Sequence, residues 1–462
     1  MHKRPLKTLL CGLAAAIGLS ASLSASAADP LKVGFVYIGP IGDHGWTYQH
    51  EQGRQALAKQ FGDKITTSYV ENVPEGADAE RVIRNMAKDK YDLIFTTSFG
   101  YMNPTLKVAK QFPKVTFEHA TGYKQDKNMG TYLARTYEGR YVAGYLAAKM
   151  TKSKKIGYVA SFPIPEVIRD INAIQLALNK YNPGTEIKVV WVNSWFDPGK
   201  EADAANALID QGVDVVFQHT DSPAPIQAAE RRGVYAVGYA SDMGHFGPKA
   251  VLTSIVNNWG PHYIQATQGV IDGNWKPQDY WGGLKEGTVQ LPISDLVPAD
   301  TKAEAEKLIA SIESGEFHPF TGPIKDQTGV EKIAAGVTAS NMNRESLAAG
   351  LQLVGWRKVP IDTSVLGRPG SVCRCLSAHL VRWHESPRGD RPGLGDAAEN
   401  PVDGRALCRT RRPDPAQDAG RVAAALGRGA LYLAVCHPLH RGGVGGGQPD
   451  LAAVATPRAC AG

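Results

Sequence analysis

Short apolar runs alternate with amphipathic segments over the first part of the chain. The runs of strand length are 32–38, 65–70, 91–97 and 115–119. The segments with helical spacing are 46–61, 75–88 and 104–112. Strands that alternate with helices of about 10–15 residues indicate βαβ units around a parallel sheet. The pattern therefore predicts an α/β lobe.

The same alternation begins again at Lys155, after a cluster of lysines. The second series of strands is predicted at 155–160, 187–192, 214–218 and 235–239. Its helices are predicted at 166–181, 200–211 and 225–232. Two similar α/β lobes are the simplest account of a pattern that repeats its order.

The N-terminus has the three parts of a secretory signal. Met1–Lys7 carries three positive charges, Leu9–Leu19 is apolar and uncharged, and Ala25–Ala27 has the A-x-A form of a cleavage site. The apolar stretch is too short for a spanning helix, although an N-terminal anchor is the alternative. We expect a signal peptide over 1–27, cleavage near Ala27/Ala28, and a soluble protein in the periplasm.

Charge is distributed unevenly along the chain. Residues 31–360 hold 25 Lys and 10 Arg against 35 acidic residues, so this body has a net charge of zero, while the leader carries +2 and residues 361–462 carry +4. A balanced body has no long-range field to attract polyanions, which argues against a nucleic-acid partner. The body also lacks cysteine, which excludes disulfides and thiolate metal sites there.

The composition changes abruptly near residue 359. Residues 361–462 contain 15 Gly, 16 Ala and 13 Arg but no Lys. This bias is expected of a GC-rich reading frame translated out of register, and a disordered appendage is the alternative. We therefore treat 346–462 as an atypical tail.

Aromatic and polar residues gather in the turns that follow the predicted strands. Most of these turns carry an aromatic residue, as in Trp46, Phe99 and Trp195. In open parallel sheets, ligands bind at the carboxyl ends of the strands. Aromatic faces with a few polar groups suit a flat molecule with polar edges. The alternative is that these aromatics fill gaps between sheet and helices.

No pattern of catalytic or metal-ligating residues stands out in the body. His44, His119, His219, His245 and His262 are scattered, with no pair four residues apart on one helix, so a zinc site is not expected. Ser98 and Ser161 lack the G-x-S-x-G elbow of an acyl-transfer nucleophile. We expect no enzyme activity, no cofactor and no metal.

Several motifs in the strand-end turns resemble those of the basic membrane protein (Bmp) family of ABC-transporter substrate-binding proteins. The resemblance extends from about Leu31 to Lys332. Its motifs are GDHGW at 42–46, TSFGY at 97–101, YEGRYVAGY at 137–145, NSWFDPGKE at 193–201, QHTD at 218–221 and FTGPI at 320–324.

The resemblance implies a type I periplasmic-binding fold, in which two Rossmann-like lobes close on a ligand. Three crossover segments would join the lobes, near 126–136, 252–256 and 283–289. Lobe 1 would comprise 28–130 and 254–285, and lobe 2 would comprise 131–253 and 286–345. A monomeric receptor for a small molecule, working with an ABC permease in the membrane, is the implied assembly.

The resemblance also implies where the ligand lies. Purine-nucleoside binders of this family hold the base between two aromatics, whose places Trp46 and Trp195 occupy. In the alignment, those binders have Asn where this chain has Thr47. They have Asp in place of Ala240 and Lys in place of Asn257, and this Asp and Lys bind the ribose. This chain retains the two aromatics but lacks the Asp and the Lys that bind the ribose. The resemblance therefore implies that the ligand is a free purine base such as adenine. The implied ligand-binding residues are Trp46, Tyr48, Ser98, Phe99, Tyr101, Trp195, Asp221, Asp242 and Asn257.

Alternatives to this prediction remain open. If the alignment is displaced by one or two residues, Asp242 takes the place of the missing Asp and a nucleoside becomes the ligand. A ligand sensor on the same fold and a nucleoside-acting enzyme are the other hypotheses. We favour an importer receptor for a purine base.

Overall fold

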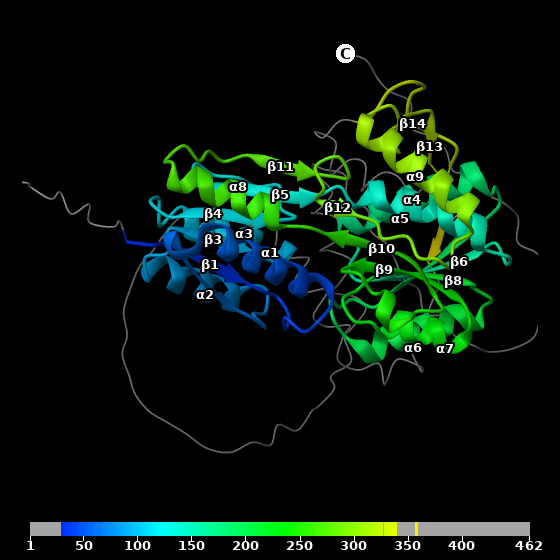
Figure 1. The fold of residues 1–462 in the computed structure, drawn as a ribbon, viewed down its shortest axis with the longest axis horizontal. Coiled ribbons are helices and arrows are strands. Elements are labelled where there is room, and N and C mark those ends of the chain that lie inside the picture. Colours follow the sequence, from blue (N-terminus) through cyan, green and yellow to red (C-terminus); the bar gives the residue numbers. More distant parts are fainter. Residues whose placement is uncertain (1–28, 327, 340–355, 359–462) are drawn as a thin grey trace, which may run out of the picture. The chain divides into compact units, whose positions relative to one another are not determined.

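The computed structural model describes residues 29–326, 328–339 and 356–358, and the account below concerns these residues. The predicted signal peptide and nearly all of the predicted atypical tail lie outside them. Helices and strands alternate through most of the described chain. The strands form two large, separate β-sheets and one small hairpin (Figure 1).

The first sheet contains six parallel strands in the order β11-β5-β4-β3-β1-β2. Its strands are β1 (Leu31–Val36), β2 (Ile65–Val70), β3 (Leu93–Thr96), β4 (Thr116–Ala120), β5 (Met129–Ala134) and β11 (Asp279–Gly282). The helices that accompany it are α1 (Gly45–Phe61), η1 (Gly62–Lys64), α2 (Ala77–Lys88), η2 (Phe99–Tyr101), α3 (Met102–Ala109) and α8 (Gly260–Ile271).

The second sheet has the order β12-β10-β9-β8-β6-β7-β15, and only its β10–β12 pair is antiparallel. Its strands are β6 (Lys155–Ala160), β7 (Glu186–Trp191), β8 (Val215–His219), β9 (Tyr235–Ala240), β10 (Val251–Asn257), β12 (Val289–Gln290) and β15 (Trp356–Lys358). The helices beside it are α4 (Thr136–Met150), α5 (Pro165–Tyr181), α6 (Pro198–Asp210), α7 (Ala224–Arg232), η3 (Gly244–Phe246) and α9 (Ala299–Ser314). A small hairpin follows, made of β13 (Ile324–Lys325) and β14 (Glu331–Ile333).

Both faces of each sheet are covered at its central strands, which explains why strands such as β1 and β3 are largely apolar. Phe35 and Phe95 pack with α1 and α8 on one face of the first sheet, and their neighbours Val36 and Ile94 pack with α2 and α3 on the other. Successive side chains of a strand point to opposite faces, so a strand between two helical layers needs apolar residues at every position.

Helix boundaries follow local chemistry. Helix α5 begins with Pro165 in its first turn, where a missing N–H costs no hydrogen bond. Helix α6 also begins with a proline, and the Asp197 carboxylate caps it by accepting from the N–H of Lys200 at 3.1 Å. Helix α7 ends at Gly233, whose φ of 67° places it in the left-handed region that favours glycine.

The chain passes between the two sheets three times. The passages follow β5, β10 and β11, at 134–136, 257–260 and 282–289. The predicted fold class, two Rossmann-like α/β lobes joined by three connections, is confirmed. Among the helices of the described residues, none is long and apolar enough to cross a membrane.

A buried ion pair links α4 to α5 beneath the second sheet. Arg140 and Asp170 are both fully buried, and Arg140 Nε lies 3.1 Å from Asp170 Oδ2. Asp170 also accepts from the Thr136 hydroxyl at 2.8 Å, and Arg140 donates to the carbonyl of Gln218 at 2.9 Å. The pair therefore fixes the carboxyl end of β8 to the helical layer.

We expect Asp170→Ala to lower the free energy of unfolding by about 3–5 kcal/mol, because it leaves the Arg140 guanidinium buried without its counter-charge. Asp210→Ala is the matched control, since it breaks the exposed ion pair of Asp210 with Arg232 at 2.7 Å and should cost less than about 1 kcal/mol. Urea unfolding measures both. Equal losses in the two variants would contradict a structural role for the buried pair.

Candidate functional site

A cavity lies at the carboxyl ends of both parallel sheets. It encloses about 370 Å³ of empty space, counting the part open to solvent, and residues of both lobes line it. The first lobe contributes Ile38, Trp46, Ser98, Phe99 and Thr121. The second lobe contributes Ile164, Glu166, Trp195, His219, Asp221 and Tyr239.

Trp46 is held rigidly in the first turn of α1. Its indole Nε1 donates to the carbonyl of Thr97 at 2.6 Å, and only 9% of the residue is exposed. The His50 and Trp259 rings pack edge-on against it, with centroids 4.5 and 5.5 Å away. The ring therefore keeps one orientation in the cavity wall without help from a ligand.

The start of α1 also touches the second lobe. The N–H of Trp46 donates to Asp221 Oδ1 at 3.2 Å, and the N–H of Gly45 donates to Ser241 Oγ at 2.8 Å. The N-cap residue, His44, makes no capping hydrogen bond, so these contacts satisfy donors that a helix start leaves free. A Cβ on Gly45 would lie 2.7 Å from the Asp221 carbonyl oxygen, and its φ is +81°, so glycine is required here.

Asp221 carries an unusual carboxyl group. Its pKa is raised to about 8, chiefly by burial and then by the nearby Glu201 charge, while the hydrogen bond from the Trp46 N–H opposes the shift. Glu201 is itself held by the Ser222 hydroxyl at 2.5 Å. Near neutral pH, Asp221 is therefore largely protonated and can both donate and accept a hydrogen bond.

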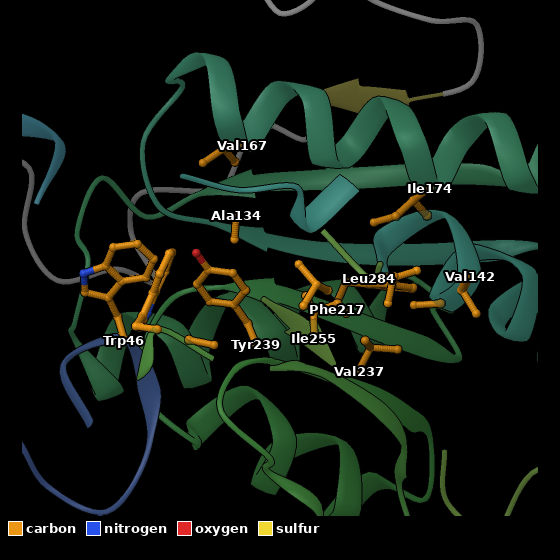
Figure 2. Close-up of a cluster of buried hydrophobic side chains, with 14 of the residues drawn as sticks. Trp46, Ala134, Val142, Val167, Ile174, Phe217, Val237, Tyr239, Ile255 and Leu284 are labelled. Carbon is orange, nitrogen blue, oxygen red and sulfur yellow. The ribbon is translucent and has the colours of Figure 1, made fainter. Parts of the chain in front are cut away.

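A second polar group comes from the ends of β8 and β9. The His219 ring stacks on Tyr239 with centroids 4.1 Å apart, and its Nδ1 lies 3.2 Å from the Ser161 hydroxyl. Its Nε2 lies 3.7 Å from Glu166 Oε1, too far for a hydrogen bond, and is buried without a partner among the described residues. Figure 2 shows Tyr239 and Trp46 at the same end of the buried cluster.

Trp195 lies in the loop between β7 and α6. Its carbonyl accepts from the N–H of Asp221 at 3.0 Å, and its ring packs against Phe162 with centroids 4.8 Å apart. Its indole Nε1 is buried, and no described residue accepts a hydrogen bond from it. Unpaired buried donors are rare in proteins, so this N–H is available to a ligand.

Five of the nine predicted binding residues line this cavity together: Trp46, Ser98, Phe99, Trp195 and Asp221. Ser98 is already engaged, since its hydroxyl donates to Glu75 Oε1 at 2.5 Å.

The other four predicted residues do not line the cavity. Tyr48 is half-buried on α1. The short helix η2 turns Tyr101 inward, where its hydroxyl donates to the Val73 carbonyl at 2.5 Å. Asp242 is exposed and accepts from the N–H of Gly244 at 3.0 Å. Asn257 is fully buried at the end of β10, and its amide has no hydrogen-bond partner among the described residues.

The cavity also contains residues that the sequence did not single out as ligands. These are Ile38, Thr121, Ile164, Glu166, His219 and Tyr239. Each lies at or just after the carboxyl end of a parallel strand, or in the segment that leads from the strand into the first turn of the next helix. This position is the signal in the sequence that could have identified them. Sequence reasoning weighed His219 only as a metal ligand, and among the described residues no group of three metal-ligating side chains occurs.

Asp221 generates a prediction about stability and pH. Because its folded pKa is raised, the folded protein binds more protons than the unfolded chain between about pH 4 and pH 8. Its contribution to the free energy of unfolding should therefore fall as pH rises through this range. Urea unfolding of the wild type and Asp221→Asn at pH 5, 7 and 9 measures the effect. The wild type should lose stability relative to the variant with rising pH, and parallel profiles would contradict the shift.

Comparison with known proteins places the chain among solute receptors. It is 56% identical over 329 residues to a purine-binding protein of Brucella abortus, covering 71% of this chain and 94% of the relative. It is 42% identical over 288 residues to a putative ABC transporter glucose-binding protein of Haloferax volcanii, covering 62% of this chain and 72% of that one.

A solved structure agrees with the fold. An ABC transporter solute-binding protein of Aeropyrum pernix matches with a TM-score of 0.54 at 21% identity, covering 69% of this chain and 96% of the other. The two-lobed architecture is thus the type I periplasmic-binding fold. A family model described as "ABC transporter substrate-binding protein PnrA-like" matches residues 31–317, more than half of the chain. The chain therefore belongs to the Bmp family of ABC-transporter substrate-binding proteins.

Proposed function

We propose that this protein captures a free purine base outside the cytoplasmic membrane and delivers it to the permease of an ABC importer. The observation that carries the proposal is that two tryptophans from different lobes, Trp46 and Trp195, line one cavity with polar groups at its edge. Walls from both lobes suit a small flat ligand that lies between them.

The chemistry of the walls supports a nitrogen heterocycle. Aromatic rings favour stacking with a flat ring, and a base–aromatic stack contributes about 1–3 kcal/mol. The Glu166 carboxylate accepts hydrogen bonds, Trp195 Nε1 donates, and the protonated Asp221 can do both. A purine has N–H donors and ring-nitrogen acceptors along its edge that match such a set. The name of the Brucella relative supports the same class of ligand.

The absence of a charged sugar clamp favours a free base over a nucleoside. Ala240 and Asn257 occupy the positions where the nucleoside binders carry Asp and Lys, and neither residue lines the cavity. Ala240 is fully buried, with a φ of 61° at the end of β9. A ribose would need acceptors and donors for its hydroxyl groups, and buried hydroxyls without partners cost about 1–3 kcal/mol each.

Glucose is the second candidate, because the Haloferax relative is named as a putative glucose-binding protein. A pyranose presents hydroxyl groups around its whole rim and needs many polar partners. In this cavity Ser98 is already engaged by Glu75, and six lining residues are apolar or aromatic: Ile38, Trp46, Phe99, Ile164, Trp195 and Tyr239. The lining therefore favours the purine.

The remaining parts of the proposal concern its setting. The protein would act as a monomer in the periplasm, after cleavage of the leader near Ala27/Ala28, with the membrane permease as its partner and without nucleic acid. It would transport rather than transform its ligand. A sensor role on the same fold would differ in its partner and leave this site unchanged.

We expect Trp46→Ala and Trp195→Ala each to weaken adenine binding by about 1–3 kcal/mol, the range for losing one stacked base. Isothermal titration calorimetry with adenine measures the affinity, and glucose is titrated in parallel. Phenylalanine at either position should retain most of the binding. Trp191→Ala, which removes a half-buried tryptophan outside the cavity, should leave affinity unchanged. Normal affinity in both cavity variants, or binding of glucose in place of adenine, would refute the stacking site.

We further expect adenine to bind at least about tenfold more tightly than adenosine, a difference of about 1.4 kcal/mol, because the ribose would meet poorer partners than water offers. Competition between the two ligands, followed by intrinsic fluorescence, provides the measurement. Equal affinities would overturn the preference. Loss of adenosine binding in Asp242→Asn would then identify Asp242 as the ribose ligand.

A further inference from the structure

A second cavity adjoins the first on the side of α5. It encloses about 360 Å³, and Phe99, Thr121, Ile164 and Glu166 line both cavities. Arg169 lines this second cavity and not the first. A ligand that extends from the first cavity into the second would therefore meet Arg169.

Arg169 is a buried arginine that forms no direct ion pair among the described residues, although the Asp170 carboxyl lies near enough to interact with its charge. Only 1% of the residue is exposed, and its Nε and Nη2 have no hydrogen-bond partner among the described residues. Its guanidinium lies over the rings of Trp281 and Tyr137, at 5.1 and 5.9 Å from their centroids. Ring faces stabilise a cation but do not accept its N–H groups in directed hydrogen bonds to oxygen.

The neighbouring carboxylates are already committed to other groups. Asp170, the next residue, holds Arg140 and Thr136. Glu138 is bound by Arg135 at 2.7 Å. A buried charge with unsatisfied donors is costly, so the guanidinium of Arg169 requires an acceptor that the described protein does not supply.

Glu166, one turn earlier on α5, needs hydrogen-bond donors, whereas Arg169 needs acceptors. Residues three apart lie on the same helical face, and Glu166 and Arg169 both line the second cavity. The Glu166 carboxylate has no hydrogen-bond donor among the described residues, with His219 Nε2 at 3.7 Å. A ligand edge that satisfies both residues offers an acceptor to Arg169 and an adjacent donor to Glu166.

We propose that Arg169 and Glu166 together recognise the lactam edge of an oxopurine, a ring carbonyl beside a ring N–H. Arg169 donates to the carbonyl oxygen, and Glu166 accepts from the N–H. An anionic substituent suits the site less, because it would meet the Glu166 carboxylate. Adenine presents the reverse order at this edge, an amino donor beside a ring acceptor, so it would bind through stacking and the other polar groups, and more weakly than an oxopurine. The inference rests on the proposed purine function and selects oxopurines within it.

The test compares hypoxanthine, which has the lactam edge, with unsubstituted purine, which lacks it. In calorimetry on the mature protein, the wild type should bind hypoxanthine at least about tenfold more tightly, because a site built to bond a polar group rejects the analogue that lacks it. Arg169→Met keeps the aliphatic stem and removes the guanidinium. It should weaken hypoxanthine binding at least about tenfold and leave purine binding unchanged.

Two further variants complete the design. Glu166→Gln should also weaken hypoxanthine binding and spare unsubstituted purine, which keeps the test decisive if Arg169→Met does not fold. Arg232→Met, at an exposed arginine on α7, is the matched control and should alter neither affinity. Urea unfolding of ligand-free Arg169→Met should show no loss of stability, since replacing an unpaired buried charge by an apolar side chain is neutral or stabilising.

Distinct outcomes would overturn the inference. Equal weakening of both ligands in Arg169→Met, or a marked loss of stability in it, would show that the guanidinium only supports the fold. Wild-type binding of hypoxanthine and purine without discrimination would overturn the lactam site alone. A wild type that binds neither of these ligands nor adenine would overturn the proposed function as well.

Discussion

The contact between the first turn of α1 and the strand ends of the second lobe sets the geometry of the whole site. The N–H groups of Gly45 and Trp46 find their acceptors on Ser241 and Asp221, across the interface between the lobes. A helix start has donors that its own turns cannot satisfy, so two lobes that meet there lose little polar solvation. The same contact places the Trp46 ring in the wall and desolvates the Asp221 carboxyl.

Behind the second lobe's side of the cavity, buried charges are arranged in two different ways. Arg140 has a carboxylate, a carbonyl and the Tyr239 ring around it, at 4.9 Å in the last case, and so fixes the strand ends that carry His219 and Tyr239. Among the described residues, Arg169 has aromatic rings beside it but no acceptor for its Nε and Nη2. Arg140 is tied to its neighbours although its Nη1 is unpaired, whereas Arg169 retains two donors that a ligand could satisfy.

The aromatic residues that line the cavity are supported differently in the two lobes. In the first lobe, His50 and Trp259 stack at 4.9 Å and support Trp46 from behind, so this wall is preorganised. In the second lobe, Trp195 stands on a loop, and its indole N–H has no acceptor among the described residues. One aromatic wall is therefore held by its neighbours, while the other retains a donor for a ligand.

The sequence by itself determined the α/β architecture, because its central strands are largely apolar and several of the helices between them begin at proline or end at glycine. It also located the strand-end turns, and so placed Trp46, Phe99 and Trp195 at the cavity. It could not decide which residues of each turn face inward: η2 buries Tyr101 against Val73, and the left-handed turn at Ala240 leaves Asp242 in solvent. Nor could it show that Glu166 and Arg169 line cavities, since helical spacing alone does not say which part of the protein a helix face packs against. Those facts depend on how the two lobes meet, because contacts between residues distant in sequence exist only once both sheets are built.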